Sequence, residues 1–169
     1  MFCFNRFLEK RWDTTDLLYI LILFQFVLLK YNPTNHIPSA RDFRDGARVI
    51  KMVAGYKGDV YFPFHSWYPV MAGKKMFVHK MPIEDVYIGF PEKFPRALIK
   101  KIENREFSAI FYDWEIRPDT RNPVEKAIAD AYRKGLEIPY AGPHTFMPMT
   151  GFKARPQTVY VPVEKREKG

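Results

Sequence analysis

The chain has 169 residues, of which 47% are hydrophobic and 27% are charged, and its formal net charge is +8 at pH 7. This length allows one domain of ordinary size, and this composition excludes an intrinsically disordered chain. The sequence has one cysteine, Cys3, which excludes an internal disulfide and a zinc site built on several cysteine ligands.

The positive charge favours an acidic partner, and nucleic acid, an anionic membrane surface and a phosphorylated substrate are the three alternatives. Lysine and arginine are spread over every predicted helix instead of forming one stripe. No helix-turn-helix or RNP-type pattern is present in the sequence. We therefore expect no nucleic-acid partner.

An apolar run lies near the start of the chain. Residues 17–29 read LLYILILFQFVLL, and only Gln25 interrupts them. A helix over this run covers about 20 Å, whereas the hydrocarbon core of a membrane is about 30 Å thick. Thr14, Thr15 and Tyr31 at the edges of the run bring it near the lower limit for a membrane span.

Three interpretations of this run stay open. A cleaved signal peptide has an apolar stretch of this length, but no small residues at a cleavage spacing follow until Ser39 and Ala40. A helix in a soluble core normally keeps a polar face, and this run has none. We expect the third, a transmembrane helix within an N-terminal segment 1–31, followed by a linker 32–38 that contains two prolines.

The rest of the chain alternates helical and extended patterns. Ser39 and Asn122 are typical N-cap residues, and Pro123 suits the first position of a helix. Helices are predicted at 40–58, 92–107 and 122–135, and strands at 59–64, 108–114, 145–149 and 158–163.

This alternation predicts an α/β fold over residues 39–163. We expect a small, mostly parallel sheet with flanking helices and a C-terminal β-hairpin, preceded by one apolar N-terminal helix. Residues 164–169 form a charged tail.

His65 directly follows the predicted strand 59–64, and α/β proteins bind ligands at the carboxyl ends of strands. No serine, cysteine or paired carboxylate lies near it at the spacing of a catalytic triad. His36, His79 and His144 show no metal-ligand spacing. His65 is therefore a ligand or interface contact, a catalytic residue or a structural one, and we expect no metal and no cofactor.

Aromatic and basic residues follow this histidine. Trp67, Tyr68, Lys74 and Lys75 join His65 as candidate binding residues. The sequence MAGKK lacks the earlier glycine and the following serine or threonine of a phosphate-binding P-loop. The two lysines belong to a solvated turn or, beside a membrane, contact anionic head groups.

Two carboxylates stand at the end of the predicted strand 108–114. Asp113 and Glu115 are alternate residues, which point the same way on an extended chain. They are a candidate acid–base pair, and the alternative is that they only cap the strand end.

The order of the segments is also informative. An apolar helix is followed by YNPTNHIP, then by ARVIKMVAGYKGDVYFPFHSWYPVMAGKKM, and then by LIKKIENREFSAIFYDW. Over residues 15–135 this order resembles the C-terminal part of bacterial membrane glycosyltransferases of the protein mannosyltransferase-like and aminoarabinose transferase-like superfamily. The positions that carry the resemblance are Gly58, Asp59, Val60, His65, Tyr68, Ala72, Gly73 and Lys74.

The resemblance implies an extracytoplasmic α/β domain that follows the last helix of an inner-membrane enzyme. Enzymes of this superfamily take sugars from polyprenyl-phosphate carriers and hold their catalytic acidic residue in an early loop, a region that this chain does not contain. The implied partners are membrane lipid, a polyprenyl-phosphate sugar or an acceptor glycan, and the remainder of a larger membrane enzyme. We therefore expect an accessory domain that does not transfer sugar by itself.

Two other functions stay open at this stage. One is a non-enzymatic, membrane-anchored binding or assembly module, whose apolar helix docks on a partner. The other is a small soluble hydrolase that uses His65 with Asp113.

Overall fold

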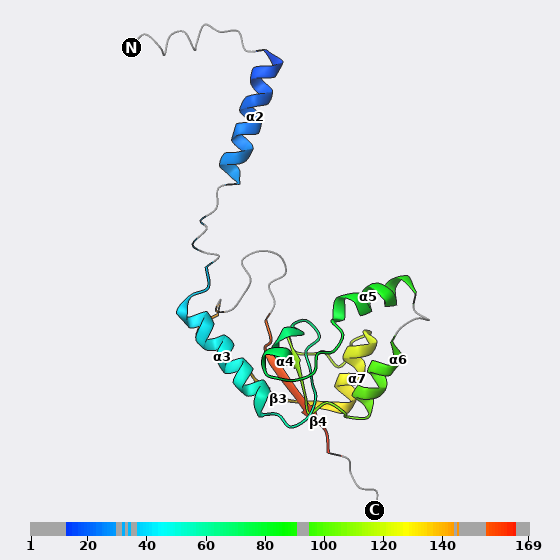
Figure 1. The fold of residues 1–169 in the computed structure, drawn as a ribbon. Helices are drawn as coiled ribbons and strands as arrows, with labels where there is room; N and C mark the ends of the chain where they lie inside the picture. Colours follow the sequence, from blue (N-terminus) through cyan, green and yellow to red (C-terminus); the bar gives the residue numbers. More distant parts are fainter. Residues whose placement is uncertain are drawn as a thin grey trace, which may run out of the picture. The chain divides into compact units, whose positions relative to one another are not determined.

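The computed structural model describes residues 13–29, 32, 34, 37–90, 95–143, 145 and 155–164. The chain divides into two compact units, Met1–Ile37 and Pro38–Gly169. Figure 1 shows the helices and strands of each.

The first unit contains helix α2 (Thr14–Leu28). The carboxylate of Asp13 begins it by accepting hydrogen bonds of 2.9 Å from the backbone N–H groups of Thr15 and Asp16. None of the described residues of α2 is buried, and its large apolar side chains are 40% to 69% exposed. No helix in the described part of the chain has the length and apolarity needed to cross a membrane. The transmembrane assignment therefore stays a prediction.

The second unit is a mixed α/β domain around a four-stranded sheet of order β1-β2-β4-β3. The strands are β1 (Val60–Tyr61), β2 (Ala109–Tyr112), β3 (Tyr132–Glu137) and β4 (Thr158–Pro162). β1 and β2 pair in parallel, whereas β4 pairs antiparallel with both β2 and β3. The prediction of a mostly parallel sheet is therefore wrong, because β4 inserts between two strands that run in the same direction.

Helices α3 (Ala40–Gly55), α4 (Trp67–Met71), α5 (Lys80–Gly89), α6 (Arg96–Glu103) and α7 (Pro123–Ala131) flank this sheet. The predicted N-caps are confirmed. Ser39 and Asp42 form a reciprocal capping box at α3, and Asn122 caps α7 with Pro123 at its first position. The sequence did not predict α4 and α5, and the start of the helix predicted at 92–107 lies outside the described residues.

The region after α7 differs from the prediction. The helix predicted over 122–135 ends at Ala131, and the following six residues form β3. Gly135 does not end a helix but lies at a register shift of β3, where a Cβ atom would stand 3.2 Å from the carbonyl oxygen of Val159. β4 thus pairs antiparallel with β3 as well as with β2, and the strand predicted at 145–149 lies outside the described residues except for Thr145, which is in a turn.

The sheet has a hydrophobic core on each face, because successive strand residues point to opposite sides. Val60 and Phe111 pack with Val49 and Val53 of α3 on one face. On the other face, strand residues such as Ile110 pack against α6 and α7. Figure 1 shows α3 on one side of the sheet and α6 and α7 on the other.

The core on the α6 and α7 side makes a stability prediction. Ile102 of α6 is fully buried, whereas its neighbour Glu103 is exposed. Ile102→Ala should lower the free energy of unfolding by about 2 to 5 kcal/mol, since it removes buried methyl groups and leaves a cavity. Denaturant unfolding of the full chain in detergent measures this change. Glu103→Ala is the matched control and should stay within about 0.5 kcal/mol of the parent protein.

Candidate functional site

One edge of the sheet collects the loops that carry polar side chains. Tyr112 at the end of β2 and Glu137 at the end of β3 both pair with Thr158 at the start of β4. Because β1 runs parallel to β2, the carboxyl end of β1 lies at the same edge. We call this edge, with the loops that follow β1, β2 and β3 and the residues that precede β4, the carboxyl edge.

His65 and Asp113 meet at the carboxyl edge. The Nε2 atom of His65 lies 2.9 Å from Oδ2 of Asp113, although the two residues are 48 positions apart. Asp113 is 2% exposed, and its Oδ1 atom is buried without a partner among the described residues. The side chain of His65 is 27% exposed. When Asp113 is ionised, the Nε2–H group donates to it, and the other ring nitrogen, Nδ1, is left as a proton acceptor with no partner among the described residues.

Two tyrosines surround this pair. The ring of Tyr68 stands perpendicular to the ring of His65, with centroids 6.0 Å apart. Burial raises the pKa of Tyr68, and the nearby Tyr140 and the negative charge of Asp113 raise it further. Burial also raises the pKa of Tyr140; Arg155 opposes this shift, and Asp113 and Asp45 add to it. Both phenols therefore keep their protons at physiological pH.

The other predicted binding residues have different environments. Trp67 is 69% exposed, whereas Tyr68 is buried. The ammonium of Lys74 donates to the carbonyl oxygens of Tyr56 and Gly58 at 2.6 and 2.9 Å, which fastens the turn after α3. Lys75 is exposed and lies 5.3 Å from the ring centroid of Phe77. Lys74 thus has a structural contact, while Trp67 and Lys75 face solvent.

The predicted acid–base residues bind different partners. Asp113 is buried and accepts a hydrogen bond from His65. Glu115 is exposed, and its carboxylate lies 2.7 Å from the ammonium of Lys134, which also lies 2.7 Å from Glu137. The structure therefore joins Asp113 to His65 rather than to Glu115.

A buried lysine was missed by the sequence analysis. The side chain of Lys80 is 5% exposed, and its ammonium lies 2.8 Å from Glu125 and 3.1 Å from Glu84. Three aromatic rings surround the same ammonium, with centroids 5.1 to 5.4 Å away; these belong to Phe64, Tyr112 and Trp114. Glu125 lies 45 positions from Lys80, so no local sequence pattern predicts this cluster.

Glu125 is the centre of the cluster. Its carboxylate accepts hydrogen bonds from Lys80, from the Tyr112 hydroxyl at 2.6 Å and from the Thr120 hydroxyl at 2.6 Å. Burial by itself would raise the pKa of Glu125, but these hydrogen bonds outweigh burial and lower the pKa below its usual value of 4.5. The buried ammonium is thus held by an ionised carboxylate at neutral pH.

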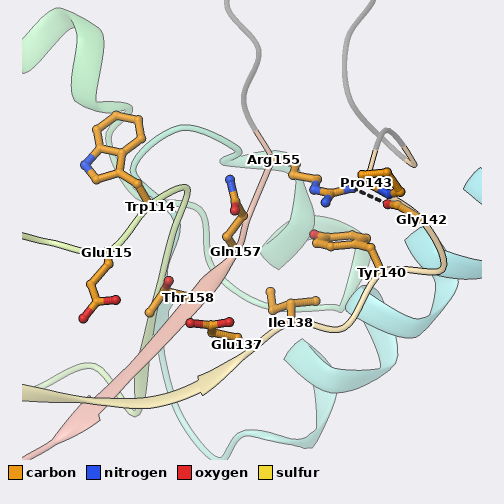
Figure 2. Close-up of a pocket in the computed structure, with 10 residues that line it drawn as sticks. All are labelled: Trp114, Glu115, Glu137, Ile138, Tyr140, Gly142, Pro143, Arg155, Gln157 and Thr158. Carbon is orange, nitrogen blue, oxygen red and sulfur yellow. Dashed lines mark hydrogen bonds between the residues drawn. The ribbon is translucent and has the colours of Figure 1, made fainter.

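Two pockets open beside Trp114. The larger, of about 540 Å³, lies between the ends of β2 and β3 and the start of β4. Figure 2 shows Gln157 between Trp114 and Arg155, with Tyr140 beneath the Arg155 guanidinium. The smaller, of about 360 Å³, reaches Thr120 and Glu125, and both pockets are bordered by Trp114 and Glu115. Within the described residues, no three histidine, cysteine or carboxylate side chains are grouped to hold a metal ion.

Comparison with known proteins identifies no relative of this chain. No protein-family model matches the chain, and neither the curated proteins nor the solved structures contain a match.

The buried lysine cluster makes a pH prediction. The lowered pKa of Glu125 means that its ionised form stabilises the folded state above about pH 4.5, and that this stabilisation is lost as the pH falls through the folded pKa. Glu125→Gln should cost about 2 to 3 kcal/mol at pH 7 and should flatten the decline of stability below pH 4.5. Thermal unfolding from pH 3 to 7 measures both effects. An unchanged pH slope in the variant contradicts the assignment, and the exposed Glu103→Gln is the control.

The His65–Asp113 bond predicts one imidazole tautomer. In the parent protein the neutral ring of His65 should carry its proton on Nε2, as long-range ¹H–¹⁵N spectra of the imidazole nitrogens would report. Asp113→Asn should abolish this preference, because the amide can either donate or accept. His79 is an internal control, since its Nε2–H donates to the Phe64 carbonyl at 2.8 Å and its Nδ1 accepts from Met81. A His65 spectrum that does not respond to Asp113→Asn contradicts the assignment.

Proposed function

We propose that the chain belongs to a membrane glycosyltransferase that uses a polyprenyl-phosphate-linked sugar. In this proposal α2 anchors the chain in the inner membrane, and the α/β unit is an accessory binding domain on the extracytoplasmic side. Sugar transfer itself is the task of other parts of the larger enzyme. The proposal extends the resemblance carried by Gly58, Asp59, His65, Gly73 and Lys74.

The observation that carries the membrane part of the proposal is the surface of α2. A helix that is apolar all round is normally enclosed by protein or by lipid. From Leu17 to Leu28 only Gln25 is polar, and none of the described residues of α2 is buried. In water this surface would be a strong liability for aggregation, so a hydrocarbon environment is the arrangement that stabilises it.

The carboxyl edge supports the binding part of the proposal. His65 presents an oriented ring nitrogen there, and Trp67 is a large exposed aromatic two residues further on. The net charge of +8 favours anionic lipid and phosphate over other ligands. These features suit a domain that meets a phosphate-linked sugar or its acceptor close to a membrane.

The His65–Asp113 pair also favours a second candidate, a hydrolase. A histidine oriented by a buried carboxylate is a common general base, and here it would accept a proton from water or from a substrate hydroxyl. A non-enzymatic binding module is the third candidate. Dependence on detergent separates the hydrolase from the two membrane-anchored candidates, because a hydrolase of the soluble kind would remain monomeric in buffer alone.

Vesicle flotation tests the anchor. The full chain should float with vesicles of phosphatidylethanolamine and phosphatidylglycerol. The double variant Leu21→Asp/Phe24→Asp places two charges in the middle of α2 and should reduce partitioning by roughly 4,000-fold, from about 2.5 kcal/mol per charge and about 1.4 kcal/mol per factor of ten. Leu21→Ile/Phe24→Leu keeps the helix apolar and is the matched control. A parent chain that stays monomeric in buffer without detergent would overturn the proposal.

Labelling tests the side of the membrane. In a Cys3→Ser background, Glu103→Cys places one thiol on the exposed face of α6. A membrane-impermeant maleimide should label this thiol in intact spheroplasts of a bacterial host. Labelling only after the spheroplasts are lysed would place the α/β unit on the cytoplasmic side and would contradict the extracytoplasmic assignment.

A further inference from the structure

The larger pocket at the carboxyl edge has a composition of its own. Its volume of about 540 Å³ falls within the range of about 300 to 1,000 Å³ that is usual for small-molecule sites. Figure 2 shows that its side chains come from the ends of β2 and β3 and from the start of β4. It is separate from the His65–Asp113 pair, since neither of these two residues lines it.

The charges around the pocket balance. Glu115 and Glu137 each lie 2.7 Å from the ammonium of Lys134, which carries one positive charge between them. The hydrogen bonds that Lys134 donates to these two carboxylates raise the pKa of Lys134, and the bond to Glu137 lowers the pKa of Glu137, so Lys134 and Glu137 stay ionised at neutral pH. Arg155 supplies the second positive charge on the opposite side. An anion would face two carboxylates and a cation would face the guanidinium, so an uncharged ligand fits best.

The hydrogen-bonding groups suit hydroxyls. The side chain of Gln157 is exposed and its amide has no partner among the described residues. The guanidinium of Arg155 lies 3.9 Å above the ring of Tyr140 and is fixed by donating to the carbonyl oxygen of Gly142 at 3.3 Å. A hydroxyl donates to a carboxylate or an amide oxygen and accepts from a guanidinium or an amide nitrogen. A ligand with many hydroxyl groups can therefore hydrogen-bond to the carboxylates, to the Gln157 amide and to the Arg155 guanidinium at the same time.

Aromatic rings border the pocket on two sides. Trp114 and Tyr140 come from different loops and line it together. Arg155 already covers one face of the Tyr140 ring, so the rest of that ring and Trp114 provide the apolar surface for the C–H groups of a sugar, while the sugar hydroxyls reach the polar side chains. This combination distinguishes a carbohydrate site from a site for small ions.

We propose that the pocket bounded by Trp114, Glu137, Tyr140, Arg155 and Gln157 binds an uncharged carbohydrate. The inference rests on the proposed function, in which this carbohydrate is part of the neutral acceptor glycan. The site would then hold sugar units of the acceptor at the carboxyl edge, next to His65 and Asp113, while the transfer takes place elsewhere in the enzyme.

Saturation-transfer NMR on the full chain tests the inference. The protein is kept in a detergent without a sugar head group, since alkyl glycosides would compete for the site. The probes are the neutral disaccharide mannobiose, the anions glucuronic acid and mannose 1-phosphate, and the cation glucosamine. Mannobiose should bind, and the charged probes should bind at least several-fold more weakly.

Gln157→Ala and Glu137→Gln should each weaken mannobiose binding by about threefold to tenfold, since each removes or alters one hydrogen-bonding partner. Gln157→Ala leaves no buried group unpaired, so it should fold as the parent does, and an unchanged thermal unfolding temperature verifies this. Glu103→Ala, on the exposed surface of α6, is the control and should bind as the parent protein does.

The outcomes are distinct. Failure of mannobiose to bind, stronger binding of the anions, or binding that neither variant weakens would overturn the carbohydrate assignment. Vesicle flotation together with any of these results leaves the proposed anchor standing. Mannobiose binding that both variants weaken, in a chain that does not float with vesicles, upholds the pocket and overturns the membrane proposal.

Discussion

Strand β4 pairs on both sides at once, and the carboxyl edge depends on this pairing. Thr158 is opposite Tyr112 of β2 and also opposite Glu137 of β3. The backbone bonds of β4 therefore fix how far the loops after β2 and β3 lie from each other and from Arg155. Asp113, Trp114, Tyr140 and Gln157 then follow in place because each lies within a few residues of a paired strand end.

The buried charge of Lys80 links the sheet to its helical cover. The ammonium is held between Glu84 of α5 and Glu125 of α7, over the ring of Tyr112 at the end of β2. Since an unpaired ammonium in such a site would be strongly destabilising, these elements have to keep their mutual positions. Trp114 belongs to the same cluster and also borders both pockets. The Lys80 cluster therefore also fixes the position of Trp114, which forms part of the wall of both pockets.

Capping residues in the sequence predicted where α3 and α7 begin, because each cap is formed by residues close together in the chain. Ser39 with Asp42, and Asn122 with Pro123, mark two helix starts because their caps are formed by residues three positions apart or fewer. β3 was not predictable in this way. Its residues YRKGLE continue the composition of α7, and only pairing with β4, more than twenty residues later, makes them extended.

In the candidate site, too, features set by nearby residues were predicted, whereas contacts between distant residues were left open or missed. The sequence placed His65 and Asp113 at the ends of two strands and offered Asp113 two partners, Glu115 in an acid–base pair or His65 in a hydrolase. Parallel pairing of β1 with β2 brings His65, and not Glu115, to Asp113. Arg155 and Tyr140 carried no signal because they lie fifteen positions apart, near the two ends of the segment that joins β3 to β4.

The register shift in β3 also affects how this domain meets other proteins. β3 forms one border of the sheet, and it carries outward-facing Arg133 and Lys134 beside the irregularity at Gly135. The opposite border, β1, is only two residues long. Charged, distorted or very short borders resist the addition of a foreign strand. Partners of this domain must therefore recognise its side chains, because the backbone offers them no template to extend.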